Sequence, residues 1–202
     1  MAITFYERAR NLGLAGGCLW LIAIGAAFVV WSLLATQSAL AISVLAVVAA
    51  LAVLLGGFGV ATIRRVLRSP FVPAVSTPDR GGIRRRFGMI VAAEVAAFVV
   101  VGRVCTTTHH WIWIVPLDLI VVGLHFLPLA QLFKVPRYYV TGALFCAIPI
   151  VTMLLVPASA QVGYARSWIA IPTVGCGLVS LATAWAGLNE VRRFLTASRA
   201  LV

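Results

Sequence analysis

Residues 12–34 read LGLAGGCLWLIAIGAAFVVWSLL, twenty-three residues without one charged side chain. A helix rises about 1.5 Å per residue, so this stretch is long enough to cross the roughly 30 Å hydrocarbon layer of a membrane. It also exceeds the roughly 7–15 apolar residues of a signal-peptide core. We therefore expect a membrane span that is retained in the protein.

The same pattern recurs along the chain. Hydrophobic residues make up 62% of the 202 residues and charged residues only 10%, against about 25% charged in soluble domains. Six spans are predicted, at residues 12–34, 40–62, 87–104, 112–133, 139–157 and 168–188. The fold class is therefore all-α integral membrane, with residues 1–202 forming a single polytopic domain.

The basic residues are distributed unevenly over the two sides of the predicted spans. Of the 16 lysines and arginines, only Arg103 and Arg166 fall on one side. The other side holds Arg8, Arg10, Arg64, Arg65, Arg68, Arg80, Arg84, Arg85, Arg86, Lys134, Arg137, Arg192, Arg193 and Arg199. Cytoplasmic connections carry the excess of basic residues. Both termini are therefore expected in the cytoplasm.

The net charge of +11 would suggest a nucleic-acid partner in a soluble protein. Here the basic residues flank apolar spans, so anionic lipid headgroups are the expected partner and nucleic acid is not. The basic cytoplasmic loop 64–86 is the longest connection and holds seven arginines and three prolines. Lipid headgroups are expected at Arg64, Arg65, Arg68, Arg84, Arg85 and Arg86.

Ionisable residues inside spans are costly and indicate functional sites. Three qualify, Glu94 in the third span and Asp118 and His125 in the fourth, with Arg103 near the outer end of the third. At 1.5 Å per residue, Glu94 lies roughly 10 Å and His125 about 12 Å from the inner ends of their spans. We expect Glu94 to pair with His125, and Asp118 to lie near Arg103.

The two expected pairs conflict, because Glu94 and Arg103 are nine residues apart and face opposite sides of a straight helix. The Glu94–His125 pair is the better match in depth, since Arg103 can extend outward to the membrane surface. A carboxylate beside an imidazole in a low-dielectric medium can bind a proton or a solute. The same pair can also be a polar lock that fixes two helices in register.

No cofactor or metal is expected. The four cysteines form no CxxC pair, and Cys105 with His109 and His110 lacks a fourth ligand, so a surface connection is the preferred interpretation. Glycines and threonines four apart, such as Gly13 and Gly17, allow close helix packing. They can serve packing within the chain or a homo-oligomer.

The fourth span carries the segment GLHFLPLA at residues 123–130, followed by Phe133, Pro136 and two tyrosines at 138 and 139. It resembles a family of bacterial six-span membrane proteins that is known only as a domain of unknown function. The resemblance implies a bacterial inner-membrane protein, with His125 and Pro128 as distinctive residues. Pro128 cannot donate a hydrogen bond to Leu124 and so opens the helix one turn from His125.

Three functions follow from these residues. The first is a small transporter or channel-like protein, with Glu94, Asp118 and His125 along a proton or solute path. The second is a membrane-embedded enzyme acting on a lipophilic substrate, with one of the two carboxylates as general acid or base. The third is a non-catalytic assembly or binding subunit. No nucleophile, phosphate loop or metal motif is apparent, so whether the protein is an enzyme is left open.

Overall fold

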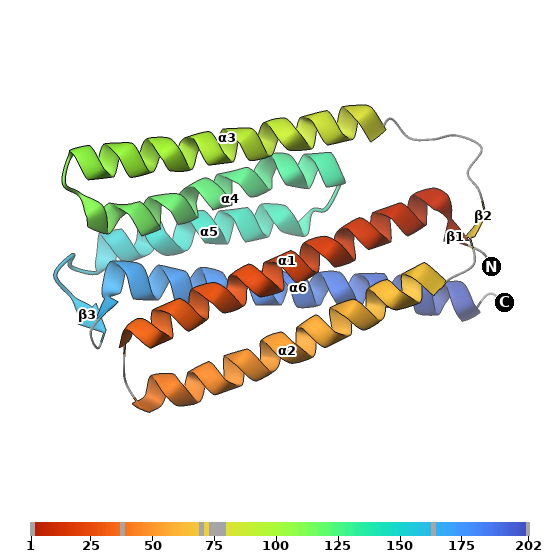
Figure 1. Ribbon diagram of the computed structural model, residues 1–202, viewed down its shortest axis with the longest axis horizontal. Helices are drawn as coiled ribbons and strands as arrows, with labels where there is room; N and C mark the ends of the chain where they lie inside the picture. The colour runs from red at the N-terminus through yellow and green to blue at the C-terminus, as the bar shows by residue number, and fades with distance from the viewer. Residues whose placement is uncertain (1–2, 37–38, 69–70, 73–79, 163–164, 201–202) are drawn as a thin grey trace.

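A computed structural model of the chain consists of six long helices (Figure 1). It describes residues 3–36, 39–68, 71–72, 80–162 and 165–200, with side chains described for 11–30, 47–68, 81–162 and 165–197. The helices are α1 (Phe5–Thr36), α2 (Ala39–Arg68), α3 (Arg80–Thr107), α4 (Ile114–Phe133), α5 (Arg137–Leu155) and α6 (Ser167–Ala200). Within the described residues, all six are long and apolar enough to cross a membrane.

Short elements connect or border the helices. The turn η1 (Trp111–Trp113) precedes α4. Strand β1 (Ile3–Thr4) pairs in parallel with β2 (Phe71–Val72), and β3 (Gln161–Val162) pairs antiparallel with β4 (Ala165–Arg166). The first pair joins the segment before α1 to the connection between α2 and α3.

The connection between α2 and α3 differs from the predicted loop 64–86. Helix α2 continues to Arg68 and α3 begins at Arg80, so Arg64, Arg65 and Arg68 and the Arg84–Arg86 run belong to helix ends. Arginine is a good helix former, and its long side chain reaches the interface from a helix that continues past the apolar layer. Residues 69–70 and 73–79 of this connection lie outside the described part of the chain.

Helix α6 occupies the centre of the bundle. It packs against α1 most extensively, and also against α5, α4 and α2. Helix α4 packs closely against α5, while α3 lies at one edge against α4, and α2 lies at the opposite edge against α1 (Figure 1). Of the six candidate spans, the one in α3 is the least buried by other helices.

Glycines form the closest helix contacts. A Cβ on Gly142 of α5 would lie 2.6 Å from the Gly123 oxygen of α4, and one on Gly123 would lie 2.8 Å from the Gly142 oxygen. The same holds for Gly25 of α1 and Gly177 of α6. A Cβ added to either of them would lie 2.8 Å from the backbone oxygen of the other. Real Cβ atoms do not approach so closely, so these two crossings require glycine on both helices.

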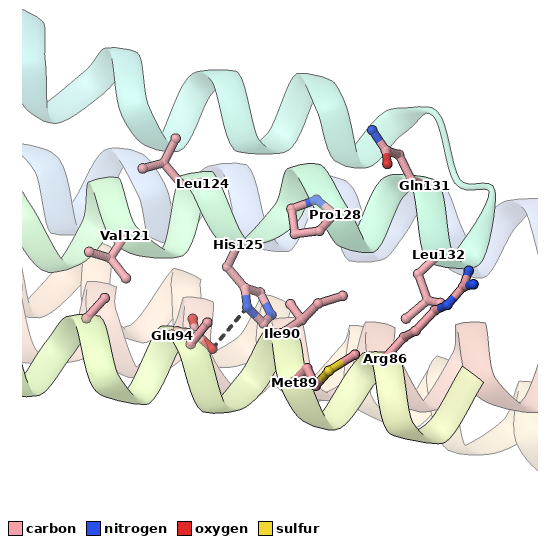
Figure 2. Close-up of a pocket in the computed structure, with 12 residues that line it drawn as sticks. Arg86, Met89, Ile90, Glu94, Val121, Leu124, His125, Pro128, Gln131 and Leu132 are labelled. Carbon is pink, nitrogen blue, oxygen red and sulfur yellow. Dashed lines mark ion pairs between the residues drawn. The ribbon is translucent and has the colours of Figure 1, made fainter. Parts of the chain in front are cut away.

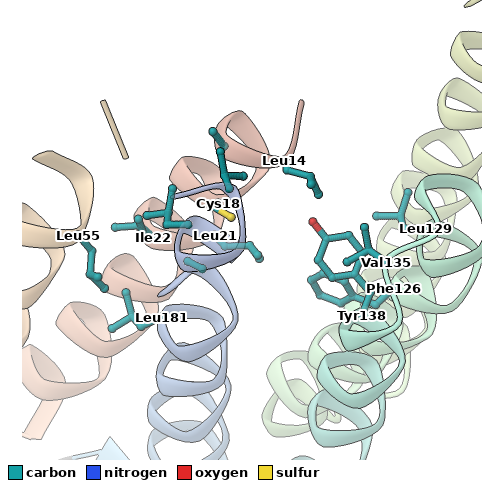
Figure 3. Packing of buried hydrophobic residues seen from close by; sticks show 14 of the residues in the cluster. Leu14, Cys18, Leu21, Ile22, Leu55, Phe126, Leu129, Val135, Tyr138 and Leu181 are labelled. Carbon is teal, nitrogen blue, oxygen red and sulfur yellow. The ribbon is translucent and has the colours of Figure 1, made fainter. Parts of the chain in front are cut away.

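Buried side chains from both halves of the bundle meet between α1, α6 and α5 (Figure 3). Tyr138 of α5 points toward α1 and packs on Phe126 of α4, with ring centroids 5.5 Å apart. One polar contact crosses the same region, a 2.8 Å hydrogen bond between the hydroxyls of Thr141 and Thr183. The core therefore fixes α4, α5 and α6 relative to α1.

The basic residues lie mostly at one end of the bundle. Helix α1 starts and α6 finishes at the end where α2 is connected to α3 and α4 to α5 (Figure 1). The basic helix ends of α2 and α3 are therefore at the same end of the bundle as Lys134, Arg137 and the last turns of α6. The side chains of Arg8, Arg10, Arg80 and Arg199, which belong to the same predicted set, are outside the described ones.

The glycine crossing between α4 and α5 makes a stability prediction. Replacing Gly142 with alanine places a methyl group against the α4 backbone, and such overpacking costs about 1–3 kcal/mol. We expect Gly142→Ala to lower the thermal unfolding temperature in detergent. The matched control is Gly102→Ala in α3, where an added Cβ meets nothing within 4 Å. Equal unfolding temperatures for the two variants would contradict the described crossing.

Candidate functional site

The structure brings two of the predicted site residues together, at the contact of α3 and α4. His125 Nδ1 lies 3.3 Å from Glu94 Oε2 (Figure 2). The side chains are 12% and 18% exposed, respectively. Both residues lie about halfway along their helices. A charged or polar pair at this depth is far from either end of the bundle.

The pair is close but not fully satisfied. The Nδ1–Oε2 separation is within the range of an ion pair, yet the buried Nδ1 atom has no aligned hydrogen-bond partner among the described residues. The angle at the nitrogen is therefore unfavourable even though the distance is short. The imidazole also interacts with the backbone of Ile90, one turn before Glu94. Hydrogen-bonding capacity remains at this ring for another partner.

The direction of the His125 side chain follows from the way in which the other face of α4 is buried. Helix α4 buries Pro116, Leu119, Gly123, Phe126, Leu129 and Ala130. Most of these residues recur every three or four positions, which places them on one face of the helix. That face contacts α5 and α6, with Gly123 at the closest point. His125 is thereby turned toward α3.

A groove of about 600 Å³ lies beside the pair, between α3 and α4 (Figure 2). We call it the α3–α4 groove. Helix α3 contributes Arg86, Met89, Ile90, Ala93, Glu94 and Ala97. Helix α4 contributes Val121, Leu124, His125, Pro128, Gln131 and Leu132. The volume is within the range of small-molecule sites, which are mostly apolar with a few polar groups.

Pro128 adds an acceptor to this groove. Because proline has no N–H, the carbonyl of Leu124 one turn earlier lacks its usual helical partner. Leu124 and Pro128 both line the groove beside His125. A backbone carbonyl without its helical bond is tolerated within a membrane where it borders a cavity. Helix α4 is continuous from Ile114 to Phe133, so the structure shows no break at Pro128, and the predicted effect of the proline is limited to this one carbonyl.

The other two predicted residues are not brought into the pair. No ion pair joins Arg103 and Asp118 among the residues whose side chains are described; Arg103 is exposed. Asp118 is half-buried, and its Oδ1 atom is buried with no hydrogen-bond partner in the described part of the chain. Neither residue lines the α3–α4 groove. Glu94 and Arg103 were expected to face opposite sides of a straight helix, so only one of the two predicted pairs could form. Because α3 is a regular helix from Arg80 to Thr107, the pair that forms is Glu94 with His125.

The outer connection between α3 and α4 contains Cys105, His109 and His110. Cys105 is buried, whereas both histidines are exposed, and His110 Nδ1 lies 2.6 Å from the Thr108 oxygen. Within the described residues, no group of three His, Cys, Asp or Glu side chains is placed to hold a metal ion.

A second polar pair was missed by the sequence analysis. Arg137 of α5 forms an ion pair with Glu190 of α6, and its Nε and Nη2 atoms are buried without partners among the described residues. Gly187 makes room for the guanidinium, since an added Cβ would lie 3.1 Å from Nη2. Glu190 lies just before the basic Arg192–Arg193 pair, so the sequence analysis did not distinguish it from the charged residues at the membrane surface. The sequence contains only five acidic residues, and this rarity was the feature that could have identified Glu190 as a partner for a buried arginine.

Comparison with protein-family profiles, with curated proteins and with solved structures finds no match.

The Glu94–His125 contact predicts an energetic coupling between the two side chains. Interhelical polar contacts in membranes contribute about 0.6 kcal/mol on average and up to about 1.7 kcal/mol. We expect Glu94→Gln and His125→Ala each to lower stability in detergent, and the double variant to lose less than the sum. A double-mutant cycle by reversible unfolding measures this coupling. Strict additivity would contradict a direct contact, and a cycle of Asp118→Asn with His125→Ala is the control.

Proposed function

We propose that this chain is a multi-pass protein of a bacterial inner membrane, with six spans and both termini in the cytoplasm. Six long apolar helices and the concentration of basic residues at one end of the bundle support this arrangement. The bacterial location rests on the resemblance of residues 123–130 to the six-span family. The arginines at the ends of α2 and α3 are proposed to attract anionic headgroups collectively, as a positively charged surface.

This topology predicts where reporter domains are active. A fluorescent protein that folds only in the cytoplasm should fluoresce when fused after Val202. An alkaline phosphatase inserted in the connection at 157–160, at the opposite end of the bundle, should be active, because this enzyme requires an oxidising compartment. The reverse pattern of the two reporters would reject the proposed orientation.

Within this topology, a small transporter or channel-like activity agrees best with the site. One observation carries the proposal: the α3–α4 groove reaches an ionisable pair halfway along the helices. Ionisable residues at this depth mark ion and substrate pathways. Glu94 and His125 can pass a proton between them, since a carboxylate and an imidazole both titrate and lie 3.3 Å apart. Arg86 and Gln131 line the groove nearer the basic end of the bundle, which is the proposed cytoplasmic entrance.

A second function is favoured by the shape of the groove. Met89, Ala93, Leu124 and Pro128 are exposed, so the groove is open along its side. A lipophilic substrate could enter from the membrane and meet Glu94 and His125 as an acid–base pair. This is the membrane-embedded enzyme, and it uses the same two residues as the transporter.

Proton flux tests the transport proposal. Wild-type protein in liposomes with an enclosed pH-sensitive dye should admit protons when a potassium diffusion potential is applied. Glu94→Gln should reduce the flux to that of empty liposomes, because the amide cannot take up a proton. Asp118→Asn makes the same chemical change outside the groove and should retain the flux. Equal flux in wild type and Glu94→Gln would reject this path.

A further inference from the structure

The two ends of the α3–α4 groove differ in charge. Arg86 lines it at the basic end of the bundle, and Glu94 lies eight residues further along the same helix, about 12 Å at 1.5 Å per residue. Glu94 is the one acidic residue in the lining, and it is held against His125. The entrance is therefore cationic, while the acidic side chain further along the groove is in contact with His125.

Apart from Gln131 near Arg86, the walls between these two points are apolar. Met89, Ile90 and Ala93 line the α3 side, and Leu124, Pro128 and Leu132 line the α4 side. Met89 is 55% and Leu124 53% exposed, so each presents about half of its side chain to whatever surrounds the bundle. At this height along the helices, the surroundings in the proposed membrane are lipid chains. The groove thus combines a cationic end with an apolar wall that is open to the side.

We infer that the α3–α4 groove binds one anionic phospholipid, with its phosphate at Arg86 and an acyl chain lying along the apolar wall toward Glu94 and His125. The guanidinium of Arg86 binds a phosphate through two parallel N–H groups. The one acidic residue of the lining lies eight residues further along α3, so no lining carboxylate at this end offsets the repulsion of a choline ammonium, and a net anionic headgroup is favoured. The side opening admits the chain from the bilayer. The assignment rests on the proposed function, because a lipid reaches the groove only if the helices span a membrane.

The direction of Arg86 distinguishes this site from general attraction to a charged membrane surface. Arg84 lies two residues earlier on the same helix, so its side chain projects about 160° away around the axis. Both arginines contribute the same charge at the same end of α3, but only Arg86 lines the groove. A surface effect depends on both equally, whereas a groove site depends on Arg86.

Lipid retention tests the inference. The full chain is reconstituted into phosphatidylcholine nanodiscs with and without phosphatidylglycerol, released into mild detergent, and weighed by native mass spectrometry. We expect the wild type to keep one phosphatidylglycerol and to discriminate against phosphatidylcholine. Arg86→Gln should lower this retention about tenfold or more, because it removes charge-assisted hydrogen bonds to the phosphate that Arg84 does not make. Arg84→Gln should leave it within twofold of wild type.

A third variant tests the groove without changing any charge. Leu124→Trp places a large side chain in the groove from an exposed position, which the fold can accommodate. It should also abolish retention, with unfolding temperature and gel-filtration profile like those of the wild type. Equal losses in Arg84→Gln and Arg86→Gln, or full retention in Leu124→Trp, would overturn the lipid site.

Proton flux, measured for the same variants in liposomes, separates this inference from the transport proposal. Retained phosphatidylglycerol with no Glu94-dependent flux upholds the lipid site and rejects transport. Glu94-dependent flux with no retained lipid overturns the lipid site and leaves transport standing.

Discussion

Close backbone contact between helices is the constraint on which the rest of this structure depends. In a membrane, lipid tails are as apolar as leucine side chains, so the hydrophobic effect does not hold helices together. Packing distance and polar contacts do so instead. The Gly25–Gly177 crossing joins α1 to α6 and the Gly123–Gly142 crossing joins α4 to α5. These two crossings set the centre of the bundle.

Helix α3 lies outside that centre, and the candidate site follows from its position. It is held mainly against α4, where the Glu94–His125 pair provides the polar contact between the two helices. Because α3 is less closely packed than α5, the surface between it and α4 leaves a groove. The Glu94–His125 pair can therefore hold α3 at the edge of the bundle and also border a ligand site. The interpretation of the pair as a polar lock and its interpretation as a functional site are compatible.

The sequence predicted most of what depends on hydropathy and helical depth. Six apolar blocks correspond to six long helices, and matching depths for Glu94 and His125 correspond to their 3.3 Å contact. Arg103 and Asp118 were also predicted at matching depths, yet they form no ion pair in the described structure. Depth along a helix does not tell which way a side chain points around the helix axis. The sequence analysis assigned residues 64–68 to a loop because they are charged. Charged residues mark where the chain leaves the apolar layer, but the helix itself continues to Arg68.

Other features depended on contacts that a single sequence does not specify. Gly13 and Gly17 have the spacing of a packing motif, yet an added Cβ on Gly13 meets nothing within 4 Å. The glycines at the actual crossings pair between helices instead: Gly123 with Gly142 of the next helix, and Gly25 of the first helix with Gly177 of the last. The Arg137–Glu190 pair likewise joins residues 53 positions apart. The groove could not be predicted, because it is a space between helices rather than a pattern of residues.

Transport, catalysis and lipid binding at this site all require the α3–α4 groove to be a ligand site. A high-resolution map of the protein in nanodiscs containing an anionic phospholipid tests it most directly. We expect elongated non-protein density from Arg86 toward His125, with the α3–α4 groove open beside the Glu94–His125 contact. A map in which α3 closes against α4, leaving no space beside His125, would contradict it.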